Sequence, residues 1–307
     1  MNGRESASSF RGRASPCLHA SAILPTVLDL SPITTGLTRG ADGIWRPATA
    51  DPGRVHYPDE ANAFCFQVED DSFWFQHRNA VIVDALTRFP PAGWLADLGA
   101  GNGFVARAIE AAGVETIVVE PGAAGIANAR RRGLTNLVQA TFEGAQFAPG
   151  TVPAAGLFDV VEHIEDDVRF LQQVNRALMR HGRLYLTVPA FDLLWSAEDD
   201  FVGHHHRYTL RRLRHRLEQT GFEVEYSTYL FAPLAIPVFL LRALPSRLGV
   251  RQSIDATKTK AELTPGSRRL VQIMNGVLSA ERQIVRRGWR IPVGSSSLVV
   301  ARKRDSV

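Results

Sequence analysis

The sequence predicts an α/β protein with a doubly wound, mostly parallel sheet of seven strands and an antiparallel C-terminal edge strand. Short apolar runs alternate with amphipathic segments between residues 94 and 188. Such alternation is typical of parallel strands joined by helices on both faces of a sheet. A glycine-rich turn, Gly99 to Gly103, directly follows the first apolar run. After residue 209 the pattern changes, and the chain ends on an apolar strand.

The predicted elements follow from spacing and from breakers. Apolar residues at helical spacing predict a helix over 73–88, which ends at Phe89-Pro90-Pro91 because proline cannot continue it. The parallel part is expected to use strands 94–98, 114–119, 136–140, 156–161 and 183–188, with helices 103–112, 122–132 and 167–180. The closing part is expected to contain helix 209–220, strand 222–229, a long amphipathic helix over 265–287, and strand 296–302, which pairs with 222–229.

The domain organisation is predicted from composition. Residues 1–55 are rich in Ser, Thr, Gly, Pro and Ala without periodicity, so we expect a flexible leader. Residues 56–307 are expected to form one domain, in which 73–90 is an N-terminal capping helix and 230–290 a helical lid insertion.

Charge and cysteine content limit the class of protein. The net charge is +4, and most basic residues are arginines scattered along the chain, so no nucleic-acid partner is expected. The two cysteines, Cys17 and Cys65, form no CxxC pair, and the N-terminus lacks a signal-peptide pattern. These features indicate a cytoplasmic location. The apolar run 229–241 is too short to span a bilayer, and we interpret it as a lid or subunit contact, as core, or as a peripheral membrane contact.

The glycine turn indicates a nucleotide cofactor, and two cofactors compete for it. A dinucleotide fingerprint reads G-x-G-x-x-G, but position 104 is Phe, which breaks the pattern. Asp97 stands two residues before the first glycine, where a carboxylate would repel a pyrophosphate and suit the positive amine of S-adenosylmethionine. Glu120 ends the next predicted strand and can accept hydrogen bonds from both ribose hydroxyls of either cofactor.

At these positions the chain resembles class I S-adenosylmethionine-dependent methyltransferases, which have a Rossmann-like fold. Residues 95–104 resemble the first motif of that family and 118–120 the second. Residues 158–163 and 182–189 resemble the small-molecule branch, close to the ubiquinone O-methyltransferase type. Residues 72–79 and 194–196 resemble a bacterial subgroup for which no substrate is named.

The resemblance implies S-adenosylmethionine as the cofactor and a role for particular residues. Asp97 and the turn would line the methionine end of the cofactor, Glu120 would hold the ribose, and the adenine would lie near Pro121 and Thr141. We expect Arg78 to meet the cofactor's carboxylate. The candidate cofactor residues are therefore Arg78, Asp97, Gly99, Ala100, Gly101, Asn102, Glu120, Pro121, Thr141 and Phe142. The family often places an Asp beside the adenine amine, whereas here Gly144 stands at that position and Glu143 is the nearest acid.

The acceptor side is expected at the carboxyl ends of the fourth and fifth strands, where open sheets place their ligands. His163 and His206 are the candidate catalytic residues, because an imidazole can take a proton from an acceptor near neutral pH. The ubiquinone-type resemblance also raises a divalent ion on Asp159, Glu162 and His163, but three neighbouring N and O ligands are weak grounds, and we assign no metal.

The sequence therefore predicts an S-adenosylmethionine-dependent methyltransferase that moves a methyl group to an O, N or C nucleophile of a small-molecule or lipid-like acceptor. Two alternatives stay open. One is an NAD(P)-dependent oxidoreductase on the same kind of sheet, and the other is a non-catalytic cofactor-binding partner protein.

Overall fold

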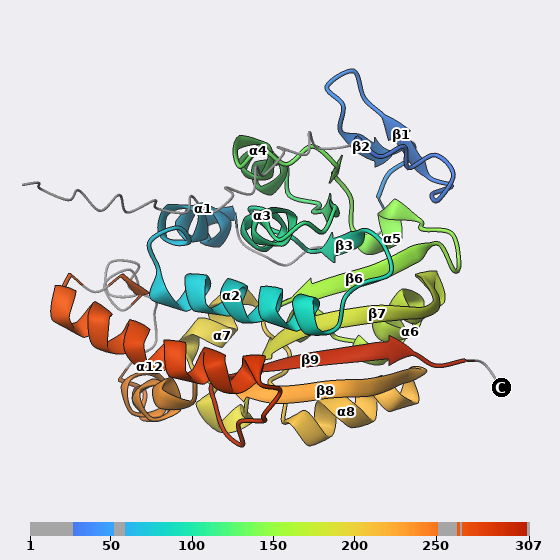
Figure 1. The fold of residues 1–307 in the computed structure, drawn as a ribbon. Coiled ribbons are helices and arrows are strands. Elements are labelled where there is room, and N and C mark those ends of the chain that lie inside the picture. Colours follow the sequence, from blue (N-terminus) through green and yellow to red (C-terminus); the bar gives the residue numbers. More distant parts are fainter. Residues whose placement is uncertain (1–26, 52–58, 251–262, 265, 306–307) are drawn as a thin grey trace, which may run out of the picture.

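One nine-stranded sheet organises the residues that the computed structural model describes, which are 27–51, 59–250, 263–264 and 266–305. The strand order is β1-β2-β5-β4-β3-β6-β7-β9-β8 (Figure 1). The strands are β1 (Leu37–Arg39), β2 (Trp45–Pro47), β3 (Leu95–Leu98), β4 (Thr116–Val119), β5 (Leu137–Val138), β6 (Val152–Phe158), β7 (Leu178–Pro189), β8 (Phe222–Leu230) and β9 (Ser296–Lys303). The predicted α/β class and mostly parallel sheet are confirmed.

The parallel centre of the sheet consists of β5, β4, β3, β6 and β7. Every residue of β3, β4, β5 and β6 is buried. Strands covered on both faces read as continuous apolar runs, which is why periodicity located them. The parallel register places Asp97 of β3 beside Val118 of β4 and Gly156 of β6, so the carboxyl ends of these strands meet at one edge.

The C-terminal strand is antiparallel, as predicted, but it is not the edge of the sheet. β9 lies between β7 and β8 and runs antiparallel to both, which leaves β8 at the edge. The composition of the two strands explains this order. Residues 298–301 of β9 are apolar and buried, whereas β8 carries Glu223, which is exposed, and Glu225, which is half-buried. Charged side chains are a common protection for an edge strand.

The prediction of a flexible leader over residues 1–55 is wrong for its second half. β1 and β2 form an antiparallel pair, and Trp45 of β2 pairs in parallel with Val138 of β5, which extends the sheet from seven strands to nine. Leu30 and Trp45 are buried in the core, so a few large apolar side chains hold a segment whose composition is otherwise that of a loop. Residues 1–26 and 52–55 lie outside the described residues.

Helices cover both faces of the sheet. α6 and α8 pack on one face, with Phe170, Leu171 and Leu217 in the core. α2, α3 and α12 pack on the other, and α2 lies against α12 (Figure 1). The helices are α1 (Asp59–Val68), α2 (Phe73–Arg88), α3 (Phe104–Ala111), α4 (Ala123–Arg131), α5 (Phe142–Ala145), α6 (Asp167–Ala177), α7 (Ala197–Val202), α8 (Leu210–Gln219), α9 (Ala235–Val238), α10 (Leu244–Arg247) and α12 (Arg268–Arg286). Short 3-10 turns are η1 (Val161–His163), η2 (Asp192–Leu194) and η3 (Ala232–Leu234), and η4 (Phe239–Ala243) is π-helical.

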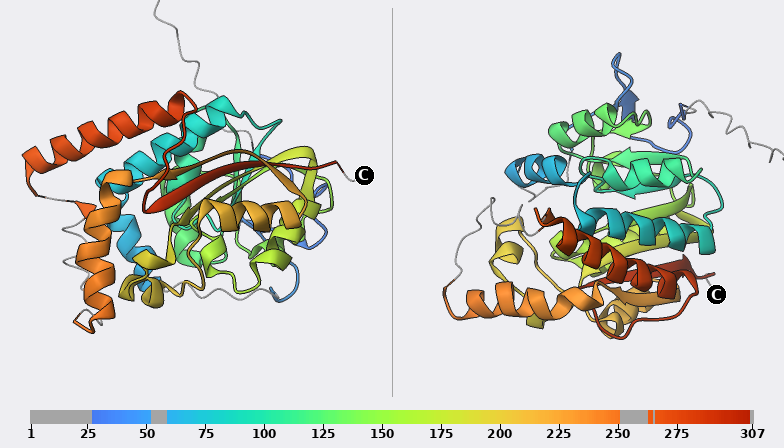
Figure 2. Two further views of the ribbon diagram at one scale, coloured as in Figure 1. Left: turned by 90° about the horizontal axis from the view of Figure 1, so that it is seen from below. Right: turned by 60° about the vertical axis from the view of Figure 1, so that its left-hand side comes forward.

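The described part of the segment 230–290 is helical, as expected. The stretch 235–247 and the first half of α12 extend past the edge at which β6 and β7 end (Figures 1 and 2). Within the described ranges, no helix combines the length and apolarity needed to cross a membrane. Residues 251–262 of the expected lid lie outside the described part of the chain.

Candidate active site

The turn between β3 and α3 requires its glycines. Gly99, Gly101 and Gly103 have φ values of 71°, 54° and 71°, a region that favours glycine. A Cβ on Gly99 would lie 2.9 Å from the Val160 side chain, and a Cβ on Gly103 would lie 2.6 Å from that of Leu134. The turn is therefore packed closely against the neighbouring loop and helix. Because its glycines have no side chains, the backbone itself lines the carboxyl edge of the sheet here.

Asp97, near the end of β3, is a buried carboxyl group, only 1% exposed. Its Oδ2 has no hydrogen-bond partner among the described residues. Burial raises the pKa of Asp97 to about 7, against the opposing positive charge of Arg78, and the negative charge of Glu120 adds to the rise. A buried acceptor atom without a donor is rare in folded proteins and invites a ligand that carries one.

Glu120 joins the glycine turn to the next loop. Its Oε2 accepts the Gly101 N–H at 2.9 Å, and its Oε1 accepts the Gly122 N–H at 2.8 Å. A carboxylate oxygen can accept more than one hydrogen bond, so these two bonds are compatible with a contact to ribose hydroxyls. Pro121, the next residue, is half-buried.

Asn102 supports the turn through its side chain, which is buried. Its Nδ2 donates to the Asn62 carbonyl at 3.0 Å, and its Oδ1 accepts from Asn128 Nδ2 at 2.9 Å. These bonds connect α1, the turn and α4. The Asn102 side chain is thus used within the protein, which leaves its backbone for the cofactor contact that the sequence predicts.

An acidic side chain lies at the end of β5, but it comes from the N-terminal segment. Asp51 Oδ2 accepts the Thr141 N–H at 2.7 Å, and Oδ1 accepts the Thr141 hydroxyl at 2.6 Å. A Cβ on Gly144 would lie 2.5 Å from the Asp51 carboxyl group. The Asp51 carboxyl group, from the segment predicted to be a leader, therefore occupies the space beside Gly144.

Phe142 and Arg78 contact protein groups that the sequence could not predict. The Phe142 ring packs against Phe170, with ring centroids 5.7 Å apart, and so faces the core. The Arg78 guanidinium forms an ion pair with Asp159 and lies 5.0 Å from the Trp74 ring centre. Asp159 also accepts the Thr187 hydroxyl at 3.0 Å. Asp159 has a φ of 59°, which is not an extended conformation. β6 therefore ends at Phe158, earlier than the predicted end at 161.

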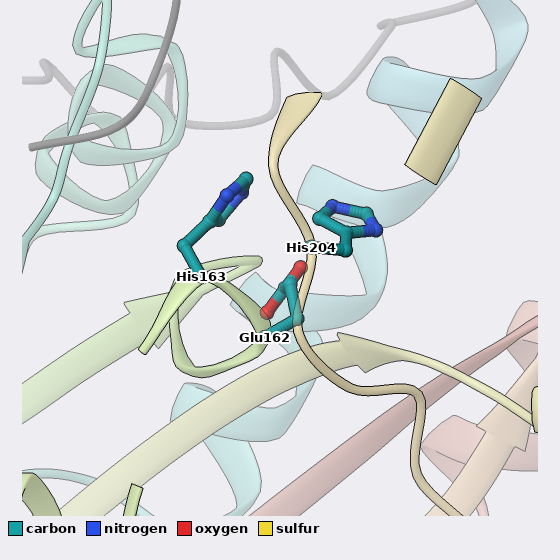
Figure 3. Close-up of side chains that lie close together, drawn as sticks. All are labelled: Glu162, His163 and His204. Carbon is teal, nitrogen blue, oxygen red and sulfur yellow. The ribbon is translucent and has the colours of Figure 1, made fainter. Parts of the chain in front are cut away.

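Three side chains gather beyond β6: Glu162, His163 and His204 (Figure 3). One ligand atom from each lies within 4.8 Å of the others. Glu162 is fully buried, and neither carboxylate oxygen has a hydrogen-bond partner among the described residues. Burial, with the negative charge of Asp159, raises the pKa of Glu162 well above its usual range.

His163 is uncharged near neutral pH. Burial, with a smaller contribution from the neighbouring His204, lowers its pKa to about 4. The ring centroids of His163 and His204 are 4.7 Å apart. The His204 Nδ1 is 2.7 Å from Asp199 Oδ1, and Asp199 is itself held by Arg207 at 2.8 Å. Arg207 and His204 hold the pKa of Asp199 at about 2 in spite of burial.

The structure does not bring His206 to this cluster. The His206 Nε2 is 3.4 Å from the Glu165 carbonyl oxygen, and its Nδ1 is 3.4 Å from Arg212 Nη2. His204, which the sequence analysis did not select, lies beside His163 instead. Three consecutive histidines gave no signal for choosing among them, since the choice depends on the backbone path after α7.

The glycine turn, the buried acid before it and the acid after β4 define a nucleotide-cofactor site at the carboxyl edge of a doubly wound sheet. A family profile described as "Methyltransferase domain" matches residues 74–227. The chain belongs to this methyltransferase family, and its cofactor is S-adenosylmethionine. The nicotinamide alternative is thereby set aside.

Solved structures resemble this chain at low sequence identity. A Haloferax volcanii protein described as a methyltransferase, in complex with the Trm112 methyltransferase activator, has a TM-score of 0.53 at 17% identity over 81% of this chain and 96% of its own. Phosphoethanolamine N-methyltransferase 2 of Haemonchus contortus, solved with S-adenosyl-L-methionine, has a TM-score of 0.48 at 18% identity over 82% of this chain and 59% of its own. No curated protein matches the chain significantly. The first likeness supports the fold alone.

Proposed function

We propose that this methyltransferase acts on a small-molecule or lipid-like acceptor, at an oxygen, nitrogen or carbon nucleophile, as a relative of the small-molecule, ubiquinone-type branch. The proposed position of the cofactor is supported mainly by one observation, the buried Asp97 carboxyl group beside the glycine turn. The cofactor's amine is a cation with N–H donors, so it supplies both the charge and the hydrogen bond that Asp97 lacks.

The proposed cofactor contacts extend along the carboxyl edge. The backbone of Gly99, Ala100, Gly101 and Asn102 would line the methionine part, and Glu120 the ribose. Pro121 and Thr141 would flank the adenine, with Phe142 contributing backbone only. Arg78, which has five N–H donors, would meet the cofactor's carboxylate while it keeps its ion pair with Asp159.

The proposed chemistry is a displacement at the methyl carbon, in which the acceptor atom attacks as the sulfur leaves. The protein must align the two atoms and accept any proton that the acceptor loses. His163 would serve as the base that takes this proton, because its neutral imidazole has a lone pair. Its low pKa makes His163 a weak base. It therefore suits a methyl acceptor whose hydroxyl or amine itself has a low pKa.

The surface next to the site suits an apolar acceptor. Ile236, Leu240 and Leu241 are 70%, 51% and 62% exposed along the stretch 235–247. We propose that this stretch covers the acceptor as part of a lid and makes a peripheral membrane contact when the acceptor is lipid-like. A cytoplasmic location stays a prediction from cysteine content.

Thermal unfolding with cofactor analogues tests the assignment of the site. S-adenosylhomocysteine is expected to raise the melting temperature, whereas NAD and NADP are expected to have no effect, because only a ligand of the folded state stabilises it. Asp97→Ala and Glu120→Ala should each abolish the shift. If both variants respond like the wild type, the cofactor lies elsewhere.

Transfer of labelled methyl groups into a metabolite extract separates an enzyme from a non-catalytic partner protein. We expect a labelled product in the organic phase if the acceptor is lipid-like, and in the aqueous phase if it is a polar metabolite. Tight cofactor binding without any transfer would favour the non-catalytic alternative.

A further inference from the structure

The group formed by Glu162, His163 and His204 has the composition of a metal site. Two imidazoles and one carboxylate form a common set of protein ligands for zinc and related transition ions, with the remaining position open to water or substrate. The three ligand atoms already lie within 4.8 Å of one another. Ligands of one tetrahedral ion lie about 3.5 Å apart, so side-chain movements of about 1 Å would close the set.

Glu162 gives an independent indication of a missing positive charge. Its side chain is fully buried, and both oxygens lack a hydrogen-bond partner among the described residues. An unpaired buried carboxyl group is costly in either protonation state, and coordination of a cation is one of the few arrangements that offsets this cost. One of these oxygens points toward the space between the His163 and His204 rings (Figure 3).

The imidazoles are prepared for coordination. Asp199 is bonded to Nδ1 of His204, which places the ring proton there and leaves the lone pair on Nε2. Asp199 is in turn held by both Nε and Nη2 of Arg207, at 2.8 and 3.0 Å. The His163 ring lies beside that of His204, with ring centroids 4.7 Å apart. A carboxylate behind a histidine is the usual support of a metal-binding imidazole.

We propose that Glu162, His163 and His204 bind one divalent transition-metal ion, of the zinc or cobalt class, beside the cofactor site. Magnesium and calcium are disfavoured because they prefer oxygen ligands. The set includes His204 instead of Asp159, because Asp159 is already paired with Arg78 and Thr187.

The ion would hold the acceptor by its hydroxyl or amine. This part rests on the proposed function. A hydroxyl bound to a divalent ion loses its proton to solvent at a lower pH. The resulting anion attacks the methyl carbon, and the carbon–sulfur electron pair leaves with sulfur, so the ion keeps its oxidation state. His163 would then act as a ligand in the ion-bound enzyme.

Titration of the chelator-treated full-length protein with Zn²⁺ and Co²⁺ tests the proposal. Calorimetry is expected to give one ion per chain, and Co²⁺ should develop the visible bands of a four-coordinate site. His204→Ala and Glu162→Gln should each weaken binding at least 100-fold. His205→Ala is the matched control, because the His205 side chain is exposed and only its backbone N–H contacts Glu162, by donating to the Glu162 backbone carbonyl.

Binding of S-adenosylhomocysteine by the same samples distinguishes this inference from the proposed function. We expect its thermal shift to persist in the metal-free protein and in both variants, which also shows that they fold. Absence of stoichiometric metal binding with the shift intact would overturn the metal site alone. Binding that survives equally in His204→Ala and Glu162→Gln would also overturn it. Absence of the shift in every sample, including the metal-loaded wild type, would instead count against the cofactor assignment.

Discussion

At the scale of single residues, the site depends on two acids with different surroundings, Asp97 and Glu120. Asp97 has a free carboxylate oxygen and a pKa of about 7, whereas Glu120 is bonded to the N–H groups of Gly101 and Gly122. The two acids differ because Asp97 lies within the sheet and Glu120 at its edge. Asp97 therefore changes its charge near neutral pH, and Glu120 orders two loops.

Cofactor affinity is predicted to depend on pH through Asp97. Binding of a cationic amine favours the ionised carboxyl, so the pKa falls on binding and a proton is released. The affinity for S-adenosylhomocysteine should rise about tenfold per pH unit from pH 5.5 and level off above about 7. Calorimetry over this range measures it. Asp97→Asn should bind weakly at every pH, and a flat profile for the wild type would contradict the role of Asp97.

Asp51 is predicted to recognise the adenine amine. Its carboxylate lies against Thr141 and fills the space beside Gly144, where the adenine edge is proposed. The wild type should prefer S-adenosylhomocysteine to S-inosylhomocysteine, in which a keto oxygen replaces the amine, by about 10- to 100-fold, since hydrogen bonds to charged groups contribute about 1.5–3 kcal/mol.

Asp51→Ala should lose this preference in competition binding. Asp29→Ala is the control, because Asp29 is exposed on the same N-terminal segment. If Asp51→Ala keeps the full preference for S-adenosylhomocysteine, another group must bind the adenine amine.

At the scale of elements, one buried carboxylate connects α2, α12 and the end of β8. Glu281 of α12 lies 2.8 Å from His77 Nε2 of α2. The same carboxylate accepts the N–H groups of Phe231 and Ala232 at 2.7 and 2.8 Å. Trp74 stacks on the Phe231 ring with centroids 5.1 Å apart. Because Arg78 follows His77, this junction also fixes the position of Arg78 over the site.

Removal of this carboxylate is predicted to destabilise the fold. Glu281→Ala leaves two buried N–H groups without an acceptor, which should lower the free energy of unfolding by about 2–4 kcal/mol. Glu281→Gln keeps one acceptor oxygen and should lose less. Urea unfolding measures both, with the exposed Gln283→Ala as the control. A loss in Glu281→Ala no greater than in this control would contradict the role of the junction.

At the scale of the whole molecule, the sheet brings distant segments to one edge. The carboxyl ends of β3, β4, β5 and β6 meet there, and α1, α7 and the stretch 235–247 lie beside that edge (Figure 1). The stretch itself lies on the side of the site and not at the opposite edge of the sheet (Figure 1). A lipid-like acceptor could then pass from a membrane to the site without crossing water.

Membrane contact is predicted to depend on Ile236 and Leu240. The wild type should float with vesicles that contain anionic lipid, and Ile236→Asp with Leu240→Asp should abolish flotation by placing charges on the contact surface. Met179→Asp, at the amino end of β7 and 41% exposed in the wild type, is the control. Phe231 is unsuitable for this test because it is fully buried. If the wild type does not float, the prediction of a membrane contact is contradicted.

Amino-acid patterns alone were enough to predict the order of strands and helices in the parallel half, the glycine turn and the two acids that flank it. These features are local: burial on both faces gives continuous apolar runs, and a positive φ requires glycine. The sequence also indicated the antiparallel pairing of 222–229 with the last strand, because both runs favour strands.

The distant residues that complete the site are identified only by the three-dimensional packing of the chain. Asp51 reaches Thr141 across 90 positions through the parallel pairing of β2 with β5, and His204 joins Glu162 and His163 through the loop after α7. The place of β9 inside the sheet and the pairing of Arg78 with Asp159 are of the same kind. Such contacts depend on the register of strands and the path of loops, which no periodicity within a short window encodes, because they are set by packing between segments far apart in the chain.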